Sequence, residues 1–97
     1  MNYKYRERAV VIEAFQMTEE RRWDNQDWPE WLHKAWNRDQ DDIGALYIDD
    51  VFLSVQTPQG SLRVAPGDWI IQGDAGELYP CKADLFDAFY EPEDGSG

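Results

Sequence analysis

The sequence has very little cysteine and histidine: Cys81 and His33 are the only residues of their types among 97. One cysteine can form neither a disulfide within the chain nor a cysteine-based zinc site. No apolar run approaches the roughly 20 residues that a membrane-spanning helix needs. Residues 1–15 lack the long apolar stretch of a signal peptide. These absences predict a soluble, cytoplasmic protein that has no cofactor and does not enter a membrane.

The residue pairings that catalysis requires are absent as well. His33 is predicted to point to solvent, in a different element from Cys81, so no Cys–His or Ser–His–Asp arrangement is indicated. Lys82 follows Cys81 directly, and a neighbouring cation is able to lower the pKa of a thiol. The aspartate pairs at 41–42 and 49–50 lack the spacing of a calcium or magnesium loop. We therefore expect no enzymatic activity and no metal site.

Positive charge is scarce, because 9 Lys and Arg face 20 Asp and Glu, for a formal net charge of −11. Residues 1–22 carry five bases and four acids, whereas residues 23–97 carry four bases and sixteen acids, for net charges of +1 and −12. A surface of this sign repels nucleic-acid phosphates and attracts a basic protein surface. The charge argues against direct nucleic-acid binding. It leaves open a merely solvated face or a protein partner.

The apolar residues that are present follow the patterns of a single α+β domain, residues 1–92, with a flexible tail at residues 93–97. Residues 9–17 (AVVIEAFQM) are rich in β-branched side chains and largely apolar on both faces. They predict a strand inside the sheet. The polar residues 18–27 predict a loop.

A helix with three tryptophans is predicted to begin near Pro29, which suits the first helical turn. It ends before the acidic run at residues 39–42. The residues that form one stripe along it are Trp28, Trp31, Leu32, Ala35 and Trp36. Such a stripe indicates packing in the core, with an exposed aromatic binding surface as the alternative.

The second half is typical of successive antiparallel strands. Residues 45–57 predict either one bent strand or a hairpin around residues 49–50. Turns are predicted at residues 57–60 and 65–68, each with Pro second and Gly shortly after it. A strand follows at residues 69–72, and Pro80 indicates that the strand at residues 77–82 either lies at an edge of the sheet or ends at that proline.

Asp84 is predicted to cap a short C-terminal helix, with Asp87 in the capping-box position. Leu85, Phe86 and Phe89 are expected to form the apolar face of this helix. Together the elements predict a small, curved, mostly antiparallel sheet of five or six strands. The Trp-rich helix and the short C-terminal helix would pack on it.

Two segments carry a family resemblance. The first is the basic opening that leads into VVIEAFQM, and the second contains PGDWIIQGDAGELYPCKADLF and ends in YE. Over residues 3–17 and 62–91 the chain resembles a widespread family of small phage and prophage proteins. The chain has Gln72 and Asp74 where that family often has a basic residue. The resemblance implies a phage accessory protein in the cytoplasm of an infected or lysogenic bacterium. It implies no catalytic mechanism.

The first functional hypothesis is a protein inhibitor with a counter-defence or host-takeover role. Its acidic surface would mimic a nucleic acid and occupy a basic groove on a host defence protein. The residues predicted to bind this partner are Asp39, Asp41, Asp42, Asp49 and Asp50.

The second hypothesis is an oligomeric sponge that sequesters a cyclic-nucleotide defence signal. A base would stack on Trp69 or Tyr79, and the phosphates would meet basic side chains gathered by a homo-oligomer. The basic residues in question are Arg6, Arg8, Arg63 and Lys82. A third possibility is a structural or assembly protein of the phage particle.

Overall fold

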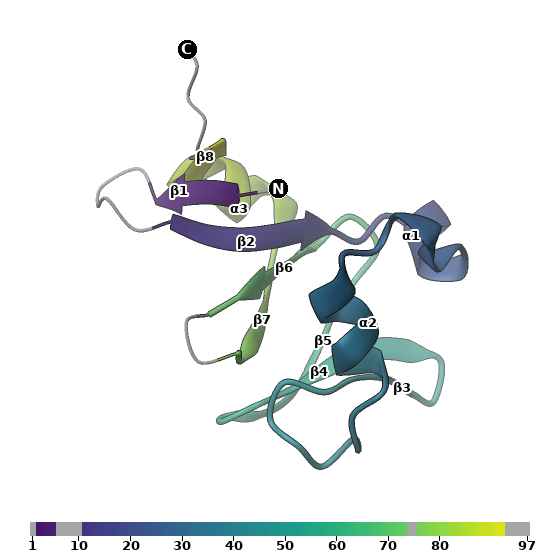
Figure 1. Ribbon diagram of the computed structural model, residues 1–97. Coiled ribbons are helices and arrows are strands. Elements are labelled where there is room, and N and C mark those ends of the chain that lie inside the picture. Colours follow the sequence, from purple (N-terminus) through teal and green to yellow (C-terminus); the bar gives the residue numbers. More distant parts are fainter. Residues whose placement is uncertain (1, 6–10, 74–75, 93–97) are drawn as a thin grey trace.

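The computed structural model describes residues 2–5, 11–73 and 76–92. Over these ranges the chain has the α+β fold that the sequence predicts, with antiparallel strands and short helices (Figure 1). The strands form two sheets rather than the single sheet expected, and eight strands lie in the described ranges. The predicted count is too low mainly because the polar segments at 2–5 and 90–92 carry no clear strand pattern of their own.

The larger sheet has five strands in the order β7-β6-β2-β1-β8. Their bounds are β1 Asn2–Tyr5, β2 Val11–Gln16, β6 Trp69–Gln72, β7 Leu78–Cys81 and β8 Tyr90–Pro92. The predicted inner strand is confirmed, because β2 lies between β1 and β6; residues 9 and 10 of that prediction lie outside the described ranges. The predicted edge strand is also confirmed, since β7 lies at one edge and carries Pro80.

The smaller sheet contains β3 (Leu46–Asp49), β4 (Phe52–Thr57) and β5 (Gly60–Arg63), in that order. The hairpin, rather than one bent strand, is the correct alternative for residues 45–57. Asp49 pairs with Phe52 across a loop of two residues, and Asp50 in that loop has a φ of 62°. Asp tolerates this left-handed conformation better than most residues.

Gly44 shapes the entry to β3. Its N–H donates to the carbonyl of Gln56 at 2.9 Å, and the Gln56 N–H donates to the carbonyl of Ala45 at 2.9 Å. Gly44 and Ala45 on one strand therefore oppose the single residue Gln56 on β4. This is a β-bulge of the type that places a glycine in the left-handed region. The φ of Gly44 is +92°. The bulge turns the chain from the preceding loop into β3.

The helices are short and lie between the strands: α1 Glu19–Trp23, the 3₁₀ helix η1 Asn25–Asp27, α2 Glu30–Trp36 and α3 Ala83–Phe89. The predicted loop at residues 18–27 is wrong, because α1 and η1 occupy most of it. Thr18 caps α1 by accepting a hydrogen bond from the Arg21 N–H, and two glutamates fill the first turn. Cap and dipole interactions thus support a helix whose residues are nearly all polar.

Two hydrophobic clusters lie on opposite faces of the larger sheet. Phe15 pairs with Ile70 on one face, and the next pair, Ala14 and Ile71, belongs to the other. The first cluster unites this sheet with α2 and the smaller sheet. Its buried members are Met17, Trp28, Leu32, Ala35, Leu46, Leu53, Val55, Val64, Ile70 and Leu78. Core packing is therefore confirmed for most of the Trp-rich stripe.

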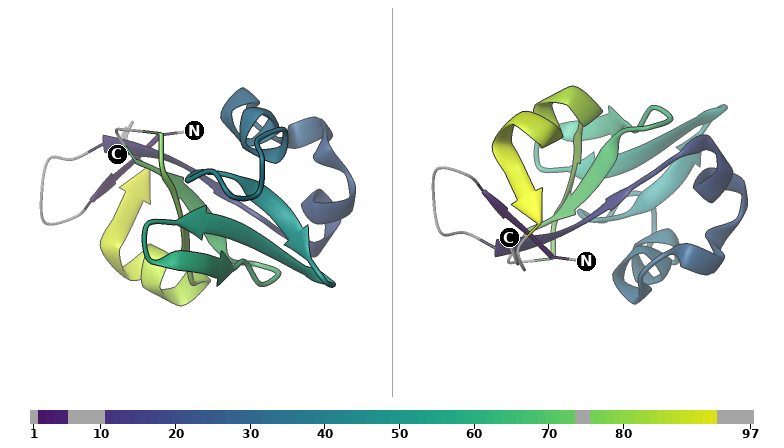
Figure 2. Two further views of the ribbon diagram at one scale, coloured as in Figure 1. Left: turned by 90° about the horizontal axis from the view of Figure 1, so that it is seen from below. Right: turned by 90° about the horizontal axis from the view of Figure 1, so that it is seen from above.

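The second cluster lies beneath α3, at the end of the molecule away from α1 and α2 (Figure 2). Phe86 is 2% exposed and stacks on Trp69 with ring centroids 4.0 Å apart. Leu85 and Phe89 are 48% and 42% exposed, so of the predicted three-residue apolar face only Phe86 is buried. Phe89 still contacts the sheet, because its ring stacks on Tyr5 of β1 with centroids 6.0 Å apart.

The capping prediction for α3 is wrong as well. The helix begins at Ala83, two residues earlier than a cap at Asp84 requires, and Lys82 occupies the N-cap position without a side-chain hydrogen bond. The Asp84 carboxylate instead accepts from the N–H of Leu85. Within the part of the chain that the structure describes, no helix is long and apolar enough to cross a bilayer.

Candidate functional site

The five aspartates predicted to bind a partner lie at the two ends of β3. Asp39, Asp41 and Asp42 belong to the loop between α2 and β3, whereas Asp49 ends β3 and Asp50 starts the tight loop to β4. All five are exposed. We call these five residues the acidic rim. They form two groups at opposite ends of the four-residue strand β3, rather than one continuous cluster.

No carboxylate of the acidic rim forms an ion pair with another described residue. Two arginines lie close to the rim, and both use their guanidinium groups on backbone carbonyls. Arg38 donates to the Ile43 carbonyl at 3.0 Å, and Arg22 donates to the Val51 carbonyl. These contacts fix the two loops that carry the aspartates. With five carboxylates against two guanidinium groups, the rim keeps a net negative charge.

An apolar hollow lies between the two halves of the rim, along the outer edge of β3. Its volume is about 250 Å³, and it is lined by Trp36, Leu46, Tyr47 and Ile48. We call it the β3 hollow. Trp36 is 41% exposed and Ile48 is 43% exposed, although both sit next to the main core. The prediction that the whole Trp-rich stripe is buried is therefore wrong at Trp36, because α2 ends there and the side chain lines the open hollow beside β3.

The walls of the β3 hollow are held by specific contacts. The Trp36 ring meets the edge of the Trp28 ring, with centroids 5.9 Å apart and an angle of 77° between the planes. Trp28 is itself buried, and its indole N–H donates to the Arg21 carbonyl at 2.7 Å. On the other side, the Tyr47 hydroxyl contacts the side chains of Gln56 and Ser61.

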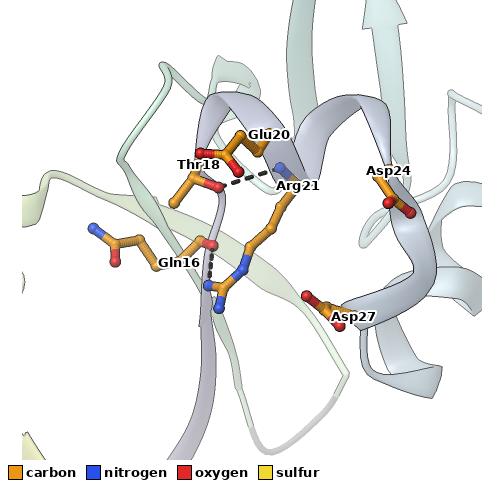
Figure 3. Close-up of a pocket in the computed structure, with 6 residues that line it drawn as sticks. All are labelled: Gln16, Thr18, Glu20, Arg21, Asp24 and Asp27. Atoms are coloured by element: carbon orange, nitrogen blue, oxygen red, sulfur yellow. Dashed lines mark hydrogen bonds between the residues drawn. The ribbon is translucent and has the colours of Figure 1, made fainter.

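A second, polar pocket of about 410 Å³ lies where β2 runs into α1 and η1 (Figure 3). Its lining residues are Gln16, Thr18, Glu20, Arg21, Asp24 and Asp27. Arg21 crosses it, with its guanidinium donating to the Gln16 carbonyl at 2.9 Å and lying over the Phe15 ring at 4.7 Å. With three acidic side chains and one guanidinium among its lining residues, the pocket suits a cationic group better than an anion. In the described part of the chain, no three acidic, His or Cys side chains come together as a metal site would require.

The residues of the predicted nucleotide site are spread over the molecule. Trp69 and Tyr79 lie on neighbouring strands of the larger sheet, but one face of Trp69 is covered by Phe86. Arg63 lies on the smaller sheet, 3.7 Å above the Phe52 ring. Lys82 is exposed at the start of α3, and Arg6 and Arg8 lie outside the described residues. The described members do not converge on one pocket within a single chain.

The fold does not realise the possibility that Lys82 lowers the pKa of the Cys81 thiol. Burial raises the pKa of the thiol above its ordinary value, and the carboxylates of Asp68 and Asp84 raise it further. The thiol therefore stays protonated at neutral pH, when it is a poor nucleophile. His33 is half-buried rather than pointing freely to solvent, because its ring lies 5.7 Å from that of Trp28.

The sequence patterns do not identify one exposed aromatic residue, Trp23. Trp23 is 77% exposed at the end of α1, and the Arg22 guanidinium lies 5.4 Å from its ring centroid. Because Arg22 also bonds Val51, Trp23 is tied to the tip of the β3–β4 hairpin. The polar composition of residues 18–27 predicts a loop and so conceals this arrangement.

Searches with this chain against protein-family models, curated proteins and solved structures found no match.

Proposed function

We propose that this protein is a phage-encoded, non-enzymatic inhibitor that binds a basic surface of a host defence protein through the acidic rim. The observation that carries this proposal is the exposure of all five aspartates without an ion pair among the described residues. Carboxylates left free in this way attract a basic partner and speed its association. The inhibitor would act in the cytoplasm of an infected or lysogenic bacterium.

The spacing of the rim supports mimicry of a nucleic acid. Its two groups lie at the ends of β3, a strand of four residues, which spans roughly 13 Å at about 3.3 Å per residue. Charges spread along a protein edge resemble a row of phosphates more closely than a compact cluster does. A groove that normally holds a nucleic-acid backbone offers Lys and Arg at such intervals.

Charge removal tests this proposal. The five aspartates are changed to Asn, because Asn keeps the shape and tolerates the φ of 62° at Asp50. The control removes five other exposed charges, with Glu19, Glu20 and Glu30 changed to Gln and Asp84 and Asp87 changed to Asn. Both variants have a net charge of −6, from −11 plus five. The measurement is the plating efficiency of a defence-sensitive phage on a panel of hosts, each carrying one defence system and expressing one version of the protein.

We expect the native protein and the control variant to restore plating on at least one host, and the rim variant to fail. Equal rescue by the rim variant would contradict the proposal. Native mass spectrometry after incubation in host lysate separates the alternatives. One bound host protein, lost as salt rises, agrees with the inhibitor. An oligomer with added mass of nucleotide size favours the sponge, and presence in purified virions favours a structural role.

A further inference from the structure

The β3 hollow and the acidic rim together have the layout of a protein-binding surface. Such interfaces have an apolar centre, often with a tryptophan, surrounded by a polar, solvent-accessible edge. Here Trp36 and Ile48 are half open at the centre, and Asp39, Asp41, Asp42, Asp49 and Asp50 flank them. Burying the exposed parts of these two side chains against a partner would be favourable, because it removes apolar surface from water.

The size of the hollow indicates what enters it. A small-molecule site usually has a volume of roughly 300–1,000 Å³ and includes several polar groups. The β3 hollow has a volume of about 250 Å³. Its only polar side-chain groups are the indole N–H of Trp36 and the hydroxyl of Tyr47, because Leu46 and Ile48 are purely apolar. It therefore fits one apolar side chain better than a nucleotide.

The hollow is also held in place before a partner arrives. Trp36 rests on Trp28, whose indole is hydrogen-bonded in the core, and Tyr47 is held through its hydroxyl. Walls that do not need to be ordered on binding reduce the entropic cost of association. An open apolar hollow with fixed walls is thus available to anchor a single side chain.

We propose that the β3 hollow receives one bulky apolar side chain from a Lys- and Arg-rich segment of the partner protein, while the acidic rim contacts the basic residues on either side of it. This inference rests on the proposed function and adds the anchor that makes the contact specific. Charge complementarity selects a basic protein segment as the occupant. A nucleic acid would be repelled by the same carboxylates.

The test uses three short synthetic peptides and the full chain. The first has a central Phe flanked on both sides by Lys and Arg, the second has Ala in place of Phe, and the third keeps Phe but has Glu in place of the basic residues. Binding is measured by calorimetry, and the Trp indole resonances are followed by NMR. We expect the Phe peptide to bind at least about tenfold more tightly than the Ala peptide and to shift the Trp36 indole resonance. The acidic peptide should not bind.

Two variants of the hollow complete the design. Ile48→Thr keeps a β-branched residue in the strand, and Trp36→Gln changes a side chain that is 41% exposed. Each should reduce the Phe preference roughly fivefold or more without changing binding of the Ala peptide. Circular dichroism confirms folding, and Ile48→Thr remains decisive if Trp36→Gln unfolds the chain.

The outcomes separate this inference from the proposed function. Equal binding of the Phe and Ala peptides, with Trp36 unmoved, overturns the anchor, and so does failure of the basic peptides to bind. Binding of the acidic peptide as tightly as the basic one overturns the role of charge. In each case the plating assay still decides the proposed function independently. Loss of rescue in the rim variant with full rescue by Ile48→Thr would retain the inhibitor and reject the hollow.

Discussion

Gly44 and Gly67 show how much of the fold depends on single residues. Both have a φ of +92°, where an L side chain is strained. They differ in their surroundings: a Cβ at Gly44 would lie 3.1 Å from the carbonyl oxygen of Gly76, whereas a Cβ at Gly67 would meet nothing within 4 Å. The pair therefore separates backbone strain from steric contact.

We expect Gly67→Ala to reduce the free energy of unfolding by about 1–2 kcal/mol, the cost of a left-handed alanine. Gly44→Ala should cost about 1 kcal/mol or more beyond that, because a backbone oxygen has to move. Urea unfolding of both variants, followed by tryptophan fluorescence, measures the difference. Equal losses would show that the loop before β3 adjusts freely, contrary to the packing of the bulge.

Cys81 gives a second prediction at this scale, because burial and the carboxylates of Asp68 and Asp84 raise the pKa of its thiol. The folded protein should react more slowly with a thiol reagent at pH 8 than the urea-unfolded chain does, since only the thiolate reacts. Asp84→Asn should raise the folded rate, and Asp87→Asn serves as the control on the same helix. A folded rate equal to that of the unfolded chain would contradict the raised pKa.

The raised pKa of the Cys81 thiol also determines the direction in which folding stability changes with pH. A thiol whose pKa is raised in the folded state loses its proton first in the unfolded state. Its contribution to stability is therefore complete below the ordinary thiol pKa and is lost as pH rises towards the folded value. Burial also raises the pKa values of Tyr3 and Tyr90, so they add to the same alkaline loss.

At the scale of the element, the local sequence pattern predicts strands and turns better than it predicts the ends of helices. The strand at residues 69–72 and the turns at 57–60 and 65–68 follow from apolar runs and Pro–Gly placement. In the second turn the Asp68 N–H donates to the Ala65 carbonyl at 2.9 Å. The stripe of apolar residues along α2 is visible in the sequence, but the five residues of α1 and the seven of α3 have too few turns to show a clear helical period. Their bounds depend on tertiary contacts that the sequence does not display.

β8 is an element that only the folded chain explains. Pro92 ends the apolar pattern of the preceding helix in the sequence, yet residues 90–92 pair with β1. Tyr90 stacks on Phe86 with centroids 4.9 Å apart and meets the edge of Tyr5 at 5.3 Å. Aromatic packing therefore holds a strand that has little strand propensity of its own.

Truncation tests this role of β8. A chain that ends after Phe89 should lose at least about 2 kcal/mol of stability, because it loses the burial of Tyr90 and leaves β1 as an exposed edge. A chain that ends after Pro92 keeps β8 and serves as the control. Urea unfolding of the two truncated chains gives the comparison, and equal stability would show that β8 contributes nothing.

At the scale of the whole molecule, composition predicts the sign of the surface charge but not how charged and apolar side chains are distributed over the surface. The excess of acids identifies the rim residues, since loops and tight turns expose their side chains. The apolar hollow between them depends on where α2 ends relative to β3, and no local pattern encodes that distance. Likewise, the sequence indicates α+β but not the division into two sheets, because pairing between strands is decided by contacts far apart in the chain.

The pairing of β1 with β8 joins Tyr3 to Pro92, residues at almost opposite ends of the sequence. During translation β1 leaves the ribosome before every other described element, and β8 leaves after all of them. One side of β1 therefore stays without its partner until synthesis of the domain is nearly finished. Closing so large a loop is slow compared with forming local contacts. The larger sheet is thus expected to be completed last, after the hairpins of the smaller sheet have formed.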